Sequence, residues 1–148
     1  MPEIRIPTPP PASSAAVRSV MQGNRGRDTK PEVALRSALH RRGLRFRKHA
    51  APLRGLRCRA DVVFPRERVA VFVDGCFWHR CPEHGLRPRT NQAYWDAKIA
   101  RNVERDARNN AALAAAGWTV VRVWEHEPLE VAAERVEAAV LAARREPA

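Results

Sequence analysis

VFVDGCFWHRCPEH, residues 71–84, is the stretch that decides the fold, because it joins an apolar strand to a loop rich in Cys and His. The nearly all-apolar run Arg68–Val73 predicts a central strand. Asp74 stands where the strand gives way to the loop, a common position for catalytic groups. The loop holds two of the three cysteines and two of the five histidines, which suggests a bound metal.

Further strands are expected on both sides of this stretch. Ala60–Phe64 predicts a strand that forms a hairpin with Arg68–Val73 across a turn at residues 65–67. Leu44–His49 alternates apolar and basic residues and predicts an earlier strand, and Trp118–Trp124 predicts a later one.

Three helices complete the pattern. The first begins at Thr29-Lys30-Pro31-Glu32, where Thr29 can cap, Pro31 suits the first turn and Glu32 completes a capping box, and Gly43 ends it. A long helix is expected over residues 92–116, ended by Gly117, and a last one over residues 128–144. In the long helix the expected buried face consists of residues spaced by four: Trp95, Ile99, Val103, Ala107 and Ala111.

The order α-β-β-β-α-β-α predicts an α/β domain over residues 17–145, after a Pro-rich leader, residues 1–16, that we expect to be disordered. The formal charge of +11 in 148 residues predicts attraction to a polyanion, usually nucleic acid, although a compositional bias toward Arg is the alternative. No apolar run approaches a membrane span, so no membrane partner is expected. Without a visible signal peptide and with an odd number of cysteines, the protein is expected in the reducing cytoplasm.

Three carboxylates are candidates for a catalytic cation site. Asp61 lies at the start of one hairpin strand and Asp74 at the end of the other, so the two are neighbours, and Glu32 lies on a helix that must pack on the sheet. Mg²⁺ favours such carboxylates and can activate water beside a scissile phosphate. The alternatives are that capping alone explains Glu32 and that Asp61 is a solvated strand end.

A second metal site is expected from Cys76, Cys81, His84 and His126, which together provide the four N/S ligands of a structural Zn²⁺. The alternative is that the cysteines are buried thiols. His79 is not needed as a zinc ligand and is instead a candidate general acid or a stabiliser of phosphate charge. Phe77, Trp78 and Trp95 are candidate aromatic wedges for DNA, with core packing an equal alternative for Trp95.

The segments that carry a family likeness are Asp28–Glu32, Arg59–Phe64, Val73–His79, Asn102–Asp106 and Gly117–Glu125. They resemble the very short patch repair (Vsr) DNA mismatch endonucleases over about Val17 to Leu129. The resemblance implies a restriction-endonuclease-like fold of the PD-(D/E)xK superfamily, with a central mixed sheet flanked by helices. It also implies nicking 5′ to the thymine of a T·G mismatch that arises from 5-methylcytosine deamination, catalytic Mg²⁺, a structural Zn²⁺ and inserted aromatics.

By the same resemblance Asp61 matches the central metal-binding aspartate, Glu32 the helix glutamate and His79 the catalytic histidine. The zinc set falls on or near the family's ligand positions, although His126 stands where a cysteine is usual, and Phe77, Trp78 and Trp95 fall on the inserted aromatics. Val73-Asp74 replaces the Thr-His of the best-known members. Val73 can then offer the cation only a backbone carbonyl, and Asp74 is expected to ligate metal or to position water.

The expected function is strand-specific nicking of mismatched double-stranded DNA at the start of very short patch repair. We expect a monomer associated with the nucleoid, with mismatch-repair proteins as further partners. One alternative is a related nuclease acting on other DNA in restriction-modification. Another is a zinc-containing DNA-binding module without catalysis, although a pure binder has no use for acids near phosphate.

Overall fold

The computed structural model describes residues 29–75 and 91–146 of the chain, which form seven elements. In chain order these are α2 (Lys30–Arg41), β1 (Arg47–Ala50), β2 (Ala60–Phe64), β3 (Val69–Asp74), α3 (Gln92–Ala115), β4 (Thr119–Trp124) and α4 (Leu129–Arg145). The predicted order of helices and strands is confirmed. The Pro-rich leader lies outside the described residues.

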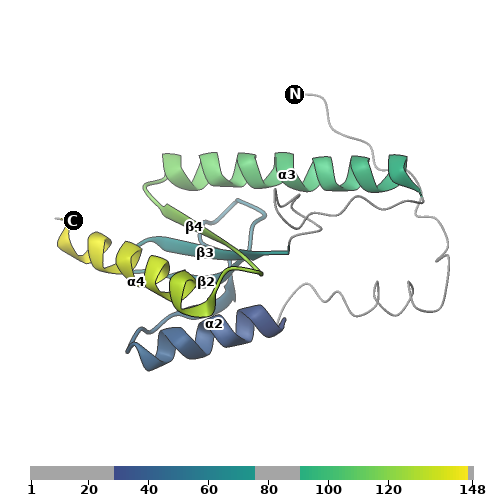
Figure 1. Cartoon of the computed structure of the whole chain (residues 1–148). Coiled ribbons are helices and arrows are strands. Elements are labelled where there is room, and N and C mark those ends of the chain that lie inside the picture. Colours follow the sequence, from purple (N-terminus) through teal and green to yellow (C-terminus); the bar gives the residue numbers. More distant parts are fainter. Residues whose placement is uncertain (1–28, 76–90, 147–148) are drawn as a thin grey trace.

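The four strands form one mixed sheet in the order β1-β2-β3-β4. The pairs β1–β2 and β2–β3 are antiparallel, which confirms the predicted hairpin, and β3 pairs with β4 in parallel. Helix α3 covers one face of the sheet, and α2 and α4 pack against each other over the opposite face (Figure 1). This mixed sheet between helices is the α/β architecture expected from the sequence.

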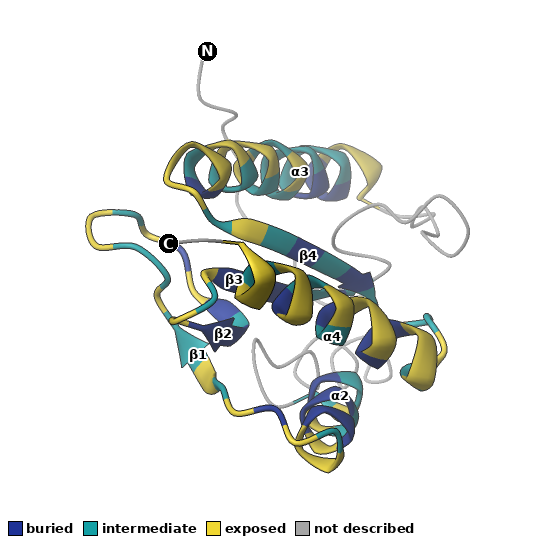
Figure 2. Cartoon of the chain, turned by 90° about the vertical axis from the view of Figure 1, so that its left-hand side faces the viewer, coloured by how far each residue is buried: buried dark blue, intermediate teal, exposed yellow. Residues whose placement is uncertain are grey.

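Strand β3 is central and largely buried, as its apolar sequence predicts (Figure 2). Its side chains alternate between two cores. On the side of α2 and α4 the core includes Val62, Phe64, Val71, Val121 and Val136. On the side of α3 it includes Val63, Ala70, Phe72 and Leu113. Full burial of each large side chain contributes roughly 1.5–3 kcal/mol to stability, so both helical layers are held firmly on the sheet.

The ends of the helices follow the local sequence signals. The Thr29 hydroxyl accepts a hydrogen bond from the Glu32 amide at 3.4 Å, which is one half of the predicted capping box. Gly43 and Gly117 follow α2 and α3 with φ angles of +79° and +84°, a left-handed conformation that glycine adopts without steric cost. None of the helices within the described residues is long and apolar enough to span a membrane.

Two expectations about element details are wrong. The first strand begins at Arg47, three residues after the predicted Leu44. In α3, Trp95 and Ile99 are buried as expected, but Val103 is 42% exposed and Leu113 is fully buried instead. The reason is geometric: a helix turns about 100° per residue, so steps of four residues drift by about 40° each and leave the buried face after two steps.

Candidate active site

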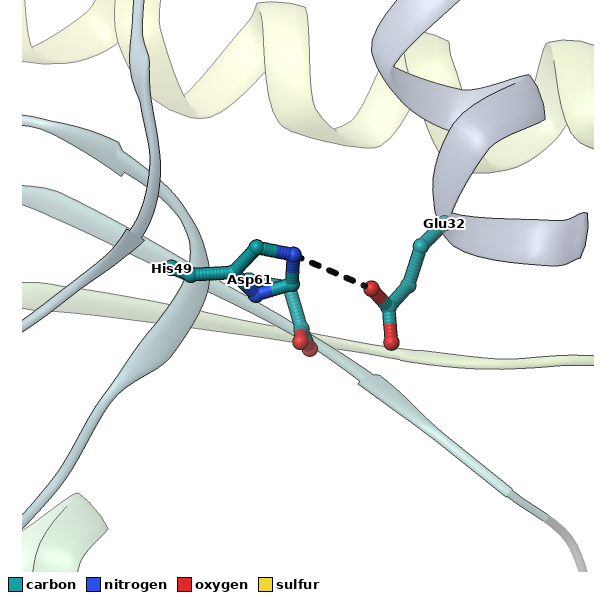
Figure 3. Close-up of side chains that lie close together, drawn as sticks. All are labelled: Glu32, His49 and Asp61. Carbon is teal, nitrogen blue, oxygen red and sulfur yellow. Dashed lines mark ion pairs between the residues drawn. The ribbon is translucent and has the colours of Figure 1, made fainter. Parts of the chain in front are cut away.

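Three side chains from separate elements converge on the sheet face that α2 covers: Glu32 from α2, His49 from β1 and Asp61 from β2. One ligand atom from each residue lies within 4.8 Å of the others (Figure 3). Glu32 and Asp61 were predicted to converge; His49 was given no role. We refer to Glu32, His49 and Asp61 as the α2-side cluster.

Asp61 is held by the edge of the β2–β3 hairpin. The residues of β2 and β3 pair from Phe64 with Val69 to Val62 with Val71, which is the pair next to Asp61. At Asp61 the side chain itself reaches the neighbouring strand, because Oδ2 accepts a hydrogen bond from the Val73 amide at 2.7 Å. A short bond to a backbone group leaves the carboxylate little freedom to turn away. Val73 thus positions Asp61 through its amide, while its predicted carbonyl contact with a cation remains a prediction.

Glu32 enters the cluster because Pro31 and the Thr29 cap fix the start of α2 above the sheet. Glu32 is only 4% exposed, so it differs from a glutamate that faces solvent in the first turn of a helix. Arg36, one turn further along α2, lies 3.6 Å from Glu32 between Nη1 and Oε2. A buried carboxylate requires such a partner, because desolvation penalises an isolated charge.

His49 is placed by the β1–β2 register. Lys48 pairs with Val62 and Ala50 with Ala60, so His49 lies opposite Asp61 between those two pairs. Its backbone adopts a φ of +48°, a conformation that non-glycine residues seldom adopt outside Asn, Asp and His. Its Nε2 atom lies 3.8 Å from Glu32 Oε2 and 3.4 Å from Arg36 Nη1. The strand pairing therefore delivers an imidazole to the two carboxylates.

Burial and the neighbouring carboxylates disfavour the charged form of Asp61. The pKa of Asp61 is raised from 3.8 to about 7, chiefly because burial disfavours the charged carboxylate. The negative charges of Glu32 and Asp74 raise that pKa further, whereas the hydrogen bond from the Val73 amide and the positive charge of Arg36 lower it. Two carboxylates and an imidazole in this state are a donor set that fits a divalent cation.

Asp74 lies in a different environment. Its carboxylate accepts hydrogen bonds from Arg122 Nη1 at 2.9 and 3.2 Å. Arg122 also donates from Nε to Asn110 Oδ1 at 2.8 Å, lies 3.7 Å from Asp106 and stacks over the Phe72 ring. These partners belong to β4, to α3 and to the core under α3. We refer to Asp74, Asp106, Asn110 and Arg122 as the α3-side cluster.

Strict alternation along β3 explains the direction of Asp74. Val73 packs against the core under α2 and α4, so Asp74 points to the other face. Asp74 bonds Arg122 and, within residues 29–75 and 91–146, does not join the cluster of Glu32, His49 and Asp61, although it was expected beside Asp61. Its charge still acts on Asp61 through the sheet. A catalytic role for the Asp74 carboxylate stays a prediction.

Only some of the remaining predicted site residues are among those that the structure describes. Cys76, Phe77, Trp78, His79, Cys81 and His84 lie outside the described residues. His126, the fourth predicted zinc ligand, follows β4 and stacks on Trp124 with ring centroids 6.5 Å apart. Trp95 is 9% exposed and meets Tyr94 edge-on with ring centroids 4.9 Å apart. This burial favours the packing alternative for Trp95.

A pocket adjoins the α2-side cluster through Val73. It lies between the start of α2, the start of α4 and the ends of β3 and β4, with a volume of about 280 Å³. Lys30 and Trp124 bring a cation and an aromatic ring to its lining, and Val73 and Val123 form part of its floor. Glu125 and Glu127 also line it, so the pocket carries more acidic than basic side chains and shares only the neighbourhood of Val73 with the cluster.

Comparison with known proteins places these features in one family. Residues 13–83, which include the whole α2-side cluster, match the family described as DNA mismatch endonuclease Vsr. The type II nicking enzyme V.NaeI of Lentzea aerocolonigenes is 52% identical over 131 residues, covering 86% of this chain and 78% of that protein. The type II nicking enzyme V.XorIIP of Xanthomonas oryzae pv. oryzae is 47% identical over 114 residues, covering 74% of this chain and 79% of that protein.

The DNA mismatch endonuclease Vsr of Escherichia coli is also similar, with 42% identity over 100 residues that cover 67% of this chain and 62% of that protein. The likeness predicted from the Val73–His79 and Arg59–Phe64 segments is thus confirmed. The chain belongs to the Vsr family of DNA endonucleases.

Proposed function

We propose that this protein is a cation-dependent endonuclease that nicks one strand of double-stranded DNA. The observation that carries the proposal is the α2-side cluster, in which two carboxylates and an imidazole meet inside a protein of net charge +11. A polyanion is attracted to such a protein as a whole, whereas carboxylates near phosphate repel it unless a cation lies between them. This pairing supports catalysis over a binding module without catalysis.

In the proposed reaction, Asp61 and Glu32 hold Mg²⁺, with the Val73 carbonyl as a further oxygen ligand. The ion would supply a water of lowered pKa and stabilise charge on the scissile phosphate. The Val73 amide keeps the Asp61 carboxylate in place through its 2.7 Å bond. His79 is proposed to protonate the leaving oxygen or to neutralise phosphate charge.

The proposed substrate is a T·G mismatch cut 5′ to the thymine, for which Phe77 and Trp78 would act as wedges between base steps. The name of the E. coli relative supports mismatch cleavage. The names of V.NaeI and V.XorIIP describe type II nicking enzymes, which favours strand nicking and keeps a restriction-modification role as the second candidate. A monomer located with the nucleoid, in contact with mismatch-repair proteins, remains part of the proposal.

Zinc is proposed to fold the segment after β3, through Cys76, Cys81, His84 and His126. Structural zinc contributes on the order of 10 kcal/mol to small sites, so Cys81→Ser should lower stability sharply. Elemental analysis of purified, folded and active protein should find one zinc per chain. A zinc-free preparation with full stability would remove this part of the proposal.

The decisive experiment is a nicking assay on end-labelled duplexes that differ in a single base pair. T·G, each other mismatch and the matched duplex are compared with Mg²⁺ and with EDTA. We expect a single nick 5′ to the mismatched thymine that requires Mg²⁺. Equal nicking of the matched duplex would favour the restriction-modification candidate. Duplex binding with no nick under any divalent cation would contradict the proposal.

A further inference from the structure

We propose that His49 supplies a nitrogen ligand to the cation held by Asp61 and Glu32, and that the site therefore binds Mn²⁺ more tightly than Mg²⁺. This inference rests on the proposed function only for the location of the cation site. It adds a ligand that comes from β1, and it changes the class of ion that the site prefers.

The position of His49 Nε2 is what makes it a candidate ligand. Arg36 Nη1 lies 3.4 Å from His49 Nε2, and a guanidinium has protons to donate but no lone pair to offer. In the neutral tautomer whose lone pair is on Nε2, that lone pair faces Arg36 and Glu32. An imidazole nitrogen with its lone pair beside two carboxylates is a suitable metal ligand.

The spacing of the donor atoms suits a single ion. Two ligand atoms bonded at about 2.1 Å to one ion are at most about 4.2 Å apart. Glu32 Oε2 and His49 Nε2 are 3.8 Å apart, and the whole cluster lies within 4.8 Å. Adjacent ligands of an octahedral ion are only about 3.0 Å apart, so closing around an ion requires the donor atoms to approach one another by up to about 1.8 Å.

Arg36 explains how the cluster remains folded before an ion enters. Its Nη1 approaches both Glu32 Oε2 and His49 Nε2, at 3.6 and 3.4 Å. Both distances exceed the 2.7–3.2 Å of well-formed hydrogen bonds. The guanidinium is thus a counter-charge for the same two groups, and we expect an incoming divalent cation to replace it there.

The combination of carboxylate oxygens and an imidazole nitrogen determines which ion the site prefers. Mg²⁺ prefers oxygen ligands alone, whereas imidazole favours first-row transition ions. Mn²⁺ accepts carboxylate oxygens as readily as Mg²⁺ and gains from the nitrogen. It is also the best probe for this chain, because it competes poorly for thiolate sites such as the predicted zinc set.

The matched substitution is His49→Asn. The backbone at His49 has a φ of +48°, which Asn tolerates better than other residues that lack a nitrogen donor. Asn has no imidazole nitrogen, and its amide oxygen reaches only about as far as the Nδ1 position, so it removes the Nε2 ligand with little backbone strain. His40→Asn is the control, because His40 is an exposed histidine on α2 that stacks on Phe46 outside the cluster.

The experiment measures Mn²⁺ and Mg²⁺ binding to the full zinc-containing chain, alone and with duplex DNA, by the electron paramagnetic resonance of free Mn²⁺ and by competition. We expect the wild type to bind Mn²⁺ at least about tenfold more tightly than Mg²⁺. His49→Asn should lower the Mn²⁺ affinity by about tenfold and change the Mg²⁺ affinity by less than about threefold. His40→Asn should change neither, and Asp61→Asn should weaken both.

A spectroscopic readout tests coordination itself. Protein labelled with ¹⁵N-histidine should show nitrogen hyperfine coupling to bound Mn²⁺, and His49→Asn should lose it. Persistent coupling in His49→Asn, an equal loss of affinity for both ions, or no Mn²⁺ binding by the wild type would each overturn the inference. Nicking with an unchanged ion preference in His49→Asn defeats the inference alone. Selective Mn²⁺ binding without nicking under any ion defeats only the proposed function.

Discussion

The α2-side and α3-side clusters lie on opposite faces of the same sheet and each contain two carboxylates, but those carboxylates have different partners. Asp74 accepts two bonds of 2.9 and 3.2 Å from Arg122, which also binds Asn110. Asp61 faces Glu32 instead, and Arg36, whose charge lowers the pKa of Asp61, also lies 3.6 Å from Glu32. We therefore expect the Asp74 carboxylate to be structural and the Asp61 carboxylate to take part in catalysis.

The difference between the two clusters follows from the alternation of side chains along β3. Neighbouring residues on a strand point to opposite faces. The Val73 amide donates to Asp61 in the α2-side cluster, whereas the carboxylate of the next residue, Asp74, accepts from Arg122 in the α3-side cluster. The α3-side cluster links the middle of α3 to β4, whereas Val73, whose amide holds Asp61, also lines the neighbouring pocket. We thus expect the sheet to separate the group that holds the fold from the group proposed to bind the cation.

The largest expected effect is on nicking. Asp61→Asn should lower the nicking rate by about a thousandfold or more, because a catalytic cation stabilises the transition state by several kcal/mol and each 1.4 kcal/mol is about tenfold. Asp74→Asn should lower the rate only in proportion to the fraction of folded protein. Single-turnover nicking, normalised to the folded fraction from circular dichroism, measures both. If Asp74→Asn loses as much as Asp61→Asn, the Asp74 carboxylate is catalytic after all.

A smaller effect concerns stability. Arg122→Met leaves Asp74 buried without its main cation, and we expect a loss of about 3–5 kcal/mol in the free energy of unfolding. The double variant Arg122→Met with Asp74→Leu should recover most of that loss, since removing both partners leaves no unpaired charge. The free energies of unfolding in urea of the wild type, the single variants and the double variant form a double-mutant cycle. A single variant as stable as the wild type would show that the α3-side cluster does not hold the fold.

The smallest effect is a pH dependence without divalent cations. The pKa of Asp61 in the folded protein, about 7, exceeds the 3.8 of the free carboxyl, so the folded state binds this proton more tightly. Stability from this group is complete at pH values below about 4 and is lost as the pH rises through about 7. Asp61→Asn should remove that decline and be more stable than the wild type at about pH 8 by on the order of 1 kcal/mol or more.

Urea midpoints at about pH 5 and about pH 8 test this point. Glu32→Gln serves as a matched control, because it removes a neighbouring charge and should lower the pKa of Asp61 without removing the carboxyl. Parallel pH profiles for wild type and Asp61→Asn would contradict the raised pKa of Asp61 in the α2-side cluster.

Much of this arrangement could be predicted from the sequence, and the failures have specific causes. Apolar runs and caps identified every element, because burial and capping act locally on residues such as Thr29 and Val71. Asp61 was found because a charged residue beside a central apolar strand needs a partner, and Glu32 because its helix must pack on the sheet. His49 was missed because the nine residues between β1 and β2, 51–59, leave the register unspecified, and only the pairing of Lys48 with Val62 puts His49 opposite Asp61.

Arg122 was missed for a related reason. Nothing in Trp118–Trp124 distinguishes an arginine that faces solvent from one that faces a buried acid, and only the parallel register, with Phe72 beside Arg122 and Asp74 beside Trp124, decides it. The buried face of α3 was misjudged because spacing by four residues was followed past the point where the helix turns it to solvent. Long-range register, not local propensity, is what the sequence left open.

The position of a bound cation tests the central claim most directly. Crystals of the full chain grown with Mn²⁺ should show, by anomalous scattering, one Mn²⁺ peak bonded to Asp61, Glu32 and His49, with Asp74 still paired to Arg122. Crystals of Asp61→Asn grown in the same way should lack that peak. A Mn²⁺ peak bonded to Asp74, with the α2-side cluster empty, would contradict the account.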